Sequence, residues 1–281
     1  MVSPNSSRWE DETMNFRTAL VMAASMIIAG SDGARASLKD LEVVGTGDGL
    51  AMLRAIAEAY NGDQTSVRIV VPKSIGSGGG ILAVASDRAR LGRIARPLKA
   101  SEKASGLVEV PIARMPSAFF VHPSTGITRL TNIELTRLFD GTITSWRTIG
   151  GADTKVRLVR REESDSTLRV LRTSVPGWDK LTLSKRSKLA MTTQEAIETV
   201  KTVPGAIGFG PYSRDLDKVV NVLSVDERSP LDPGYPSAVT LSLIFKGGRK
   251  DEEISSFLAF CRTKTAAEII ARFGAAAIPQ R

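Results

Sequence analysis

Near its start, the sequence repeats one unit twice: a short apolar run, a glycine-rich turn, and then apolar residues at helical spacing. The first copy consists of the run Leu41–Val44, the turn Gly45–Gly49 and the helical pattern Leu50–Tyr60. The second copy has the β-branched run Val67–Val71 and the turn Gly76–Gly80. Consecutive strand–turn–helix units predict an α/β protein with parallel strands, in which ligands bind at the carboxyl ends of the strands.

The two glycine turns favour a small-anion site without establishing one. Each could bring backbone N–H groups to an anion at a helix N-terminus, and we expect the second helix to open at Ile81. Glycine turns that are purely steric are an equal alternative. Neither turn ends in Gly-Lys-Ser/Thr, which excludes a P-loop, and no run gives the dinucleotide-binding pattern G-x-G-x-x-G followed by an acidic residue.

The stretch 127–169 has the clearest local signals. Thr131 and Glu134 have the spacing of a capping box, and Gly141 can end the short helix that follows. A second Thr/Glu pair, Thr192 and Glu195, predicts another capping box.

This region also carries a family resemblance. The run LTNIELTRLFDGTITSWRTIGGAD, residues 130–153, resembles the central signature of the phosphate-binding proteins of bacterial phosphate ABC transporters, which contains G-x-I-T-x-W-x-x-[IV]-G-G-x-D. Weaker similarity runs from about Val43 to Pro279 and includes Leu91–Glu102, similar to I-G-x-x-S-R-P-L-x-x-x-E. The resemblance implies a two-lobed α/β periplasmic binding protein fold with a ligand cleft and two hinge crossovers.

In that fold, we expect residues 37–118 and 238–281 to form the first lobe and residues 119–237 to form an inserted second lobe. Strands Leu107–Ala113 and Ala118–Val121 would lead from one to the other. Two helices, at about Glu252–Arg262 and Thr265–Phe273, would close the chain on the first lobe. Cys261 belongs to an apolar pattern at helical spacing, which indicates core packing.

The resemblance also implies an anion site built from four segments. A desolvated tetrahedral anion needs N–H and hydroxyl donors, together with an arginine that offsets its charge. The residues that the resemblance places there are Thr46, Gly47, Asp48, Gly49, Ser77, Gly78, Arg96, Arg161, Ser164, Asp165, Ser166 and Thr167.

The third loop departs from the family pattern R-x-x-G-S-G-T-R. Here Arg161 is followed by Ser164, Asp165 and Ser166, so that both glycines are replaced and an aspartate stands in place of a serine. Asp48 and Asp165 would put two carboxylates beside a divalent anion, which is unfavourable unless one accepts a proton of the ligand. The ligand could also differ from phosphate, and Asp165 could simply cap a helix.

The N-terminus indicates export. A basic segment after Met14, the apolar run Ala19–Gly30 and the sequence Ala34-Arg35-Ala36 have the pattern of a secretory signal peptide. We expect residues 1–36 to be this signal, with Met14 as the true start and the periplasm as the destination. An anchor that stays uncleaved is the alternative.

We therefore expect an extracytoplasmic solute-binding protein that delivers phosphate, or a similar small oxyanion, to an ABC permease in the inner membrane. The alternatives are another small solute, or an exported sensor or scaffold that binds a protein. The formal net charge of +8 favours anionic partners, but the export signal and the small number of aromatic residues disfavour nucleic acid. With His122 as the one histidine and no metal-ligand cluster, we expect no enzyme activity, no cofactor and a monomer.

Overall fold

The computed structural model describes residues 39–63 and 67–279, and all of them belong to one compact unit that spans residues 38–281. The expected signal peptide, residues 1–36, lies outside the described residues. No helix in the described part of the chain combines the length and apolar character that a membrane crossing requires.

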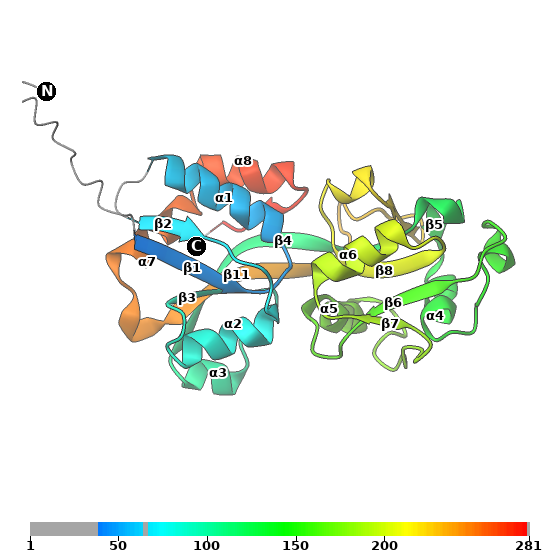
Figure 1. Cartoon of the computed structure of the whole chain (residues 1–281), viewed down its shortest axis with the longest axis horizontal. Coiled ribbons are helices and arrows are strands. Elements are labelled where there is room, and N and C mark those ends of the chain that lie inside the picture. The colour runs from blue at the N-terminus through cyan, green and yellow to red at the C-terminus, as the bar shows by residue number, and fades with distance from the viewer. Residues whose placement is uncertain (1–38, 64–66, 280–281) are drawn as a thin grey trace, which may run out of the picture. The chain divides into compact units, whose positions relative to one another are not determined.

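The main sheet runs through two lobes in the strand order β2-β1-β3-β11-β4-β8-β6-β7 (Figure 1). In the first lobe, β1 pairs in parallel with β2 and β3, as the repeated units predict, and β11 is antiparallel to β3 and β4. The elements of this lobe are β1 (Lys39–Gly45), α1 (Leu50–Asp63), β2 (Val67–Val70), α2 (Gly76–Ala85), β3 (Leu91–Ile94), α3 (Ala100–Ala104), β4 (Leu107–Val121, shared), β11 (Ala238–Lys246), η4 (Gly247–Arg249), α7 (Glu252–Phe260), α8 (Lys264–Arg272) and β12 (Ala276–Ala277).

The second lobe continues the sheet through β8, β6 and β7, with β6 parallel to both of its neighbours. A separate short pair joins β5 and β10. The elements of the second lobe are η1 (Pro123–Thr125), β5 (Arg129–Leu130), α4 (Asn132–Phe139), η2 (Trp146–Ile149), β6 (Arg157–Arg161), α5 (Ser166–Ser174), β7 (Lys188–Ala190), α6 (Thr193–Thr202), β8 (Ala206–Pro211), η3 (Leu216–Lys218), β9 (Asn221–Val222) and β10 (Ser224–Val225).

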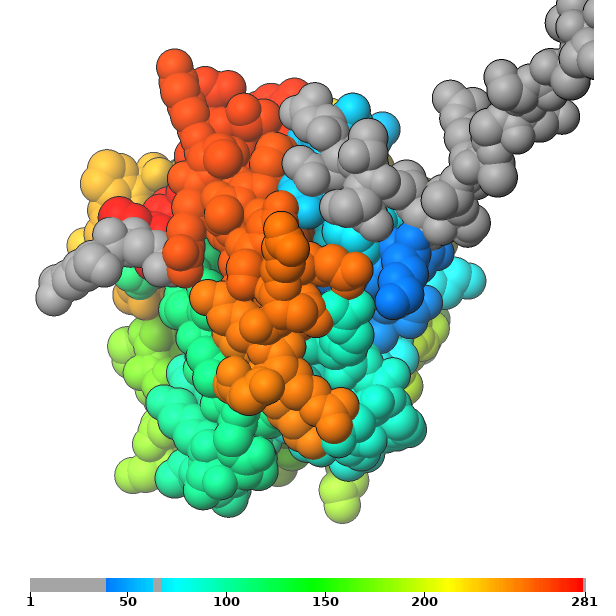
Figure 2. Space-filling view, turned by 90° about the vertical axis from the view of Figure 1, so that its left-hand side faces the viewer, coloured from blue at the N-terminus to red at the C-terminus, as the bar shows by residue number. Residues whose placement is uncertain are grey.

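Each lobe has its own apolar core. In the first, Tyr60 of α1 packs edge-on against Phe257 of α7 with ring centroids 5.3 Å apart, and Cys261 is buried in the same core, as predicted. Burial raises the pKa of the Cys261 thiol to about 12. Figure 2 shows the C-terminal elements, in orange and red, beside the blue and cyan N-terminal ones on this lobe. In the second lobe, Phe119 and Trp178 are buried with ring centroids 5.1 Å apart.

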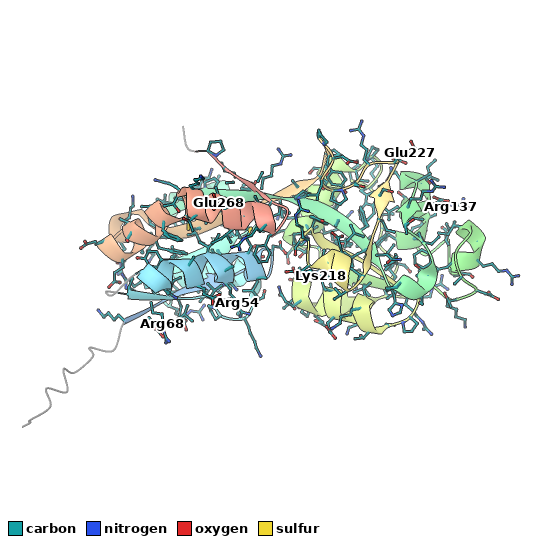
Figure 3. All side chains as sticks on the ribbon, turned by 90° about the horizontal axis from the view of Figure 1, so that it is seen from above. Arg54, Arg68, Arg137, Lys218, Glu227 and Glu268 are labelled. Carbon is teal, nitrogen blue, oxygen red and sulfur yellow. The ribbon has the colours of Figure 1, made fainter. Side chains whose placement is uncertain are left out.

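Charged side chains cover the outside of both lobes. Figure 3 shows Arg54 and Glu268 on the first lobe, on α1 and α8, and Arg137 and Glu227 on the second. Arg54 and Arg137 are exposed on helix faces whose opposite sides are buried.

The first capping box forms as predicted. Thr131 Oγ1 accepts the Glu134 N–H, and the Glu134 carboxylate accepts the Thr131 N–H at 2.8 Å. The second box is only half formed, so this prediction was wrong in part. Thr192 does accept the Glu195 N–H, but the Glu195 carboxylate turns to the N–H of Met191 at 2.8 Å.

The expected strands Leu107–Ala113 and Ala118–Val121 are one continuous strand, β4. Pro111 and Pro116 lie inside it, although a proline cannot donate a backbone hydrogen bond. β4 pairs with β11 up to Pro116 and with β8 from Ser117 onward, so that it changes partner where it passes from one lobe to the other.

Candidate functional site

A cavity of about 150 Å³ lies between residues of the two lobes. The first lobe contributes the turn after β1, the start of α2 and the turn after β3, and the second lobe contributes the turn between β6 and α5. Because these turns follow parallel strands, the cavity lies at the carboxyl ends of the strands, as expected for an α/β sheet. The sequence-predicted residues that line it are Thr46, Gly47, Ser77, Gly78, Arg96, Arg161, Ser164, Asp165 and Ser166.

The glycine run after β2 is not a loop, which corrects the sequence prediction. Helix α2 already begins at Gly76, so the glycines form its first turns. Gly80 lies against β1, where an added Cβ would come within 2.8 Å of the Gly45 Cα. The N-cap residue, Ile75, supplies no side-chain cap, and the Gly76 N–H donates to Ser74 Oγ at 3.2 Å. The residues of the first turn, 76–79, line the cavity.

Two serines join the lobes at the cavity wall. Ser77 Oγ of α2 lies 3.0 Å from Ser166 Oγ of α5, and it also accepts the N–H of Ala95 at 3.1 Å. Both serines are buried. The starts of α2 and α5 therefore meet at one point, and both helix dipoles favour negative charge there.

Asp165 is the N-cap of α5. Its Oδ1 accepts the Leu168 N–H at 2.9 Å, while its Oδ2 accepts two hydrogen bonds from Arg161, from Nε at 3.0 Å and from Nη2 at 2.8 Å. A third Arg161 donor, Nη1, reaches the carbonyl of Ala190 at 2.7 Å. The helix-capping interpretation of Asp165 is thus correct, and the Arg161 guanidinium already has a carboxylate partner.

Arg96 has a partner as well. Its Nη1 and Nη2 donate to the two oxygens of Glu102 at 2.8 and 2.7 Å. This bidentate pair is the main reason why the pKa of Glu102 falls to about 2. Arg96 therefore lines the cavity as half of a neutral pair.

Asp48 is buried behind the cavity and does not line it. Thr193 Oγ1, on α6 of the other lobe, donates to Asp48 Oδ1 at 2.6 Å. Beside it, Gln194 Nε2 donates to the carbonyl of Gly47 at 2.8 Å. Burial, followed by the negative charge of Asp165, raises the pKa of Asp48 to about 6.

Gly49 and Thr167 also lie outside the cavity lining. Gly49 has a φ of +65° and stands directly before α1, where an added Cβ would come within 2.9 Å of the Met115 sulfur. Thr167 is buried in the first turn of α5. The glycine meets a backbone requirement, and the buried threonine hydroxyl has no hydrogen-bond partner among the described residues.

Sequence reasoning missed three cations of this site. Arg93, at the end of β3, is fully buried and donates to backbone carbonyls, including those of Thr46 at 2.7 Å and Pro72 at 2.9 Å. Burial lowers its pKa to about 10. Lys99 and Arg169 line the cavity, are exposed, and form no ion pair within the described residues. Of these three residues, only Arg93 had a signal that sequence reasoning could have used, namely its position near the end of a strand.

Besides the carboxylates of Glu162 and Asp165, the cavity offers backbone N–H groups, hydroxyls and cationic side chains, which suit an oxyanion. Across residues 39–63 and 67–279, no group of three or more His, Cys, Asp or Glu side chains could hold a metal ion.

Comparison with known proteins gives one family. Residues 30–263 match the family model described as a PBP superfamily domain. The chain is 29% identical over 234 residues to the phosphate-binding protein PstS of Bacillus subtilis (strain 168), covering 75% of each sequence. It is 23% identical over 192 residues to PstS of Borreliella burgdorferi, covering 64% of this chain and 69% of the relative.

Solved structures agree on the fold. A putative phosphate ABC transporter substrate-binding protein from Clostridium perfringens, with bound phosphate, superposes with a TM-score of 0.77 at 24% identity, covering 86% of this chain and 100% of that one. An ABC-type phosphate transport receptor from Vibrio cholerae gives 0.63 at 22% identity, covering 85% and 100%.

Proposed function

The chain belongs to the PBP superfamily, and we propose that it is the solute-binding protein of an ABC transporter that takes phosphate as its ligand. The family resemblance and the two-lobed α/β fold predicted from the sequence are confirmed. This family binds substrates for transporters and is not enzymatic, which agrees with the expected lack of catalysis. The observation that carries the proposal is that turns from both lobes line one polar cavity.

In this proposal the anion accepts hydrogen bonds from the first N–H groups of α2 and α5 and from the hydroxyls of Ser77 and Ser166. Their position at two helix starts supports this role. Lys99 and Arg169 supply positive charge and form no ion pair within the described residues, while the carboxylate of Glu162 lines the same cavity. Arg161 and Arg96 act as ion pairs, so they contribute hydrogen-bond donors more than net charge.

The surrounding biology is part of the same proposal. The protein would be exported by residues 1–36, would act outside the cytoplasm as a monomer, and would deliver its ligand to an inner-membrane permease. Residues 37–118 and 238–281 would form one moving body and residues 119–237 the other. The separate apolar cores support this division.

Isothermal titration calorimetry of the purified chain with phosphate tests the function. We expect saturable binding of one phosphate per chain, and we expect Ser77→Ala to weaken it about tenfold, the cost of one hydrogen bond to a charged group. Ser86→Ala is the matched control, because Ser86 is an exposed serine at the other end of the same helix. Absence of heat at millimolar phosphate would remove phosphate as the ligand.

One observation favours a different small solute as the second candidate. Two of the three arginines that line the cavity, Arg96 and Arg161, are paired with carboxylates, and a further aspartate, Asp48, lies behind the wall. A ligand with less negative charge than a phosphate dianion would suit this balance. A thermal-shift panel of oxyanions and zwitterions, all at the same concentration and ionic strength, separates the candidates, because the solute that binds the folded protein most tightly raises the melting temperature most.

A further inference from the structure

Asp48 is a buried carboxyl with an unused oxygen. The residue is 1% exposed, and its Oδ1 accepts the Thr193 hydroxyl at 2.6 Å. Its Oδ2 has no hydrogen-bond partner among the described residues. An ionised carboxylate in such a place loses its hydrogen bonds to water and gains no others, which disfavours it. A neutral carboxyl carries no charge and has an O–H donor of its own.

The charges that face Asp48 do little to stabilise its ionised form. Asp165, across the lobe boundary, repels it, and Arg161 attracts it. The Arg161 guanidinium, however, points at Asp165 Oδ2 and at the carbonyl of Ala190. On its own lobe, the nearby cation Arg93 spends its donors on backbone carbonyls, one of them that of Thr46. The Arg161–Asp165 pair thus leaves a net repulsion on ionised Asp48, because the repulsion by Asp165 exceeds the attraction by Arg161.

An anion in the cavity adds a further negative charge at this boundary. Gly47, next to Asp48 in sequence, lines the cavity, as does Thr46, whose Oγ1 accepts the Asp48 N–H at 3.2 Å. Like charges this close disfavour each other's ionised forms. The ligand therefore shifts Asp48 further toward its neutral form.

We propose that the cleft takes up one proton together with its anion, and that Asp48 is the residue that holds this proton. The proton comes from solvent and adds to the carboxylate, so no other group changes its bonding. By linkage, the proton strengthens anion binding by the same factor by which the anion strengthens proton binding. The inference depends on the proposed anion-binding function and adds a pH control to it.

The experiment counts protons by calorimetry. Phosphate is titrated into the full chain at pH 7.5 in two buffers of different ionisation enthalpy, and the slope of heat against that enthalpy gives the number of protons taken up. We expect the wild type to take up close to one proton more than Asp48→Asn. Protonation of phosphate itself is common to both proteins and cancels in this difference. Asp153→Asn, at an exposed carboxylate, is the control and should match the wild type.

The affinity should follow the same pattern. Above about pH 6, the wild-type affinity relative to Asp48→Asn should fall by up to about tenfold per pH unit, the limit for one linked proton. Thr193→Val removes the hydroxyl that favours the ionised carboxylate of Asp48. The affinity of this variant should therefore begin to fall below that of Asp48→Asn at a higher pH than the wild-type affinity does. This second variant keeps the test valid if Asp48→Asn alters the fold.

The outcomes are distinct. Phosphate binding with equal proton counts in the wild type and Asp48→Asn overturns the inference and leaves the proposed function intact. A uniform loss of affinity in Asp48→Asn at every pH also overturns it, since that result indicates a structural role. No phosphate binding by the wild type between pH 5 and 8 overturns the function and the proton linkage together.

Discussion

Replacing Asp48 by asparagine should stabilise the ligand-free protein at neutral pH. Asparagine has nearly the same shape and can still accept the Thr193 hydroxyl, but it carries no charge to bury. The pKa of Asp48 is about 6 in the fold against 3.8 for an unperturbed aspartate. At about 1.4 kcal/mol per pKa unit, a difference of roughly two units corresponds to about 3 kcal/mol.

The sign and the pH window follow from the raised pKa. Between about pH 4 and pH 6, the folded protein holds a proton that the unfolded chain has already released, so folding stability falls as the pH rises. Asp48→Asn lacks this proton. Its gain in unfolding free energy over the wild type should therefore be close to zero below about pH 4 and should reach about 3 kcal/mol above about pH 6.

Urea denaturation of both proteins at a series of pH values measures the difference directly. The urea midpoints of the two proteins should move apart as the pH rises, while the slope of the unfolding free energy against urea concentration stays the same in both. Asp153→Asn, at an exposed carboxylate in a surface ion pair, should show no such trend. An advantage for Asp48→Asn that does not change with pH, or a loss of stability at pH 8, would show that the fold compensates the charge of Asp48.

Two further substitutions test the predicted local structure by the same urea assay. Thr131→Ala removes the cap of α4 and should cost about 1 kcal/mol, whereas Thr131→Ser should keep most of that stability; equal stability of both variants would contradict the capping role. Trp146→Phe removes the indole N–H that donates to the carbonyl of Gly205 at 2.8 Å, while that carbonyl keeps the Arg157 N–H at 2.9 Å, so the substitution should cost about 1 kcal/mol; an unchanged urea midpoint would disprove this.

The sequence was most informative where local chemistry decides the structure. The capping box of Thr131 and the cap at Asp165 depend on residues three positions apart, and both form. The glycine run was misplaced because the packing of Gly80 against β1 is a long-range contact. For the same reason, the strand β4 could not be predicted as continuous, since its partners β11 and β8 come from distant parts of the chain.

At the site, the converging segments could be predicted but their charge state could not. The resemblance identified nine residues that do line the cavity. Whether Arg161 faces a ligand or Asp165 depends on side-chain direction, which carries no sequence pattern. Arg93 was missed because a buried arginine that binds only backbone carbonyls looks like any other arginine in a sequence.

The passage of β4 between the lobes has a mechanical consequence. Its Ser117 N–H donates to the carbonyl of Ser237, at the returning crossover, at 2.9 Å, and the Pro116 carbonyl accepts the Tyr212 N–H. The two crossings are thus tied side by side into a narrow pivot. A rotation of a few degrees in the backbone at this pivot becomes a larger swing of the far turns. The stiffness of a few peptide units at Pro116 and Ser117 would therefore set how readily the cleft between the lobes opens to admit and release its ligand.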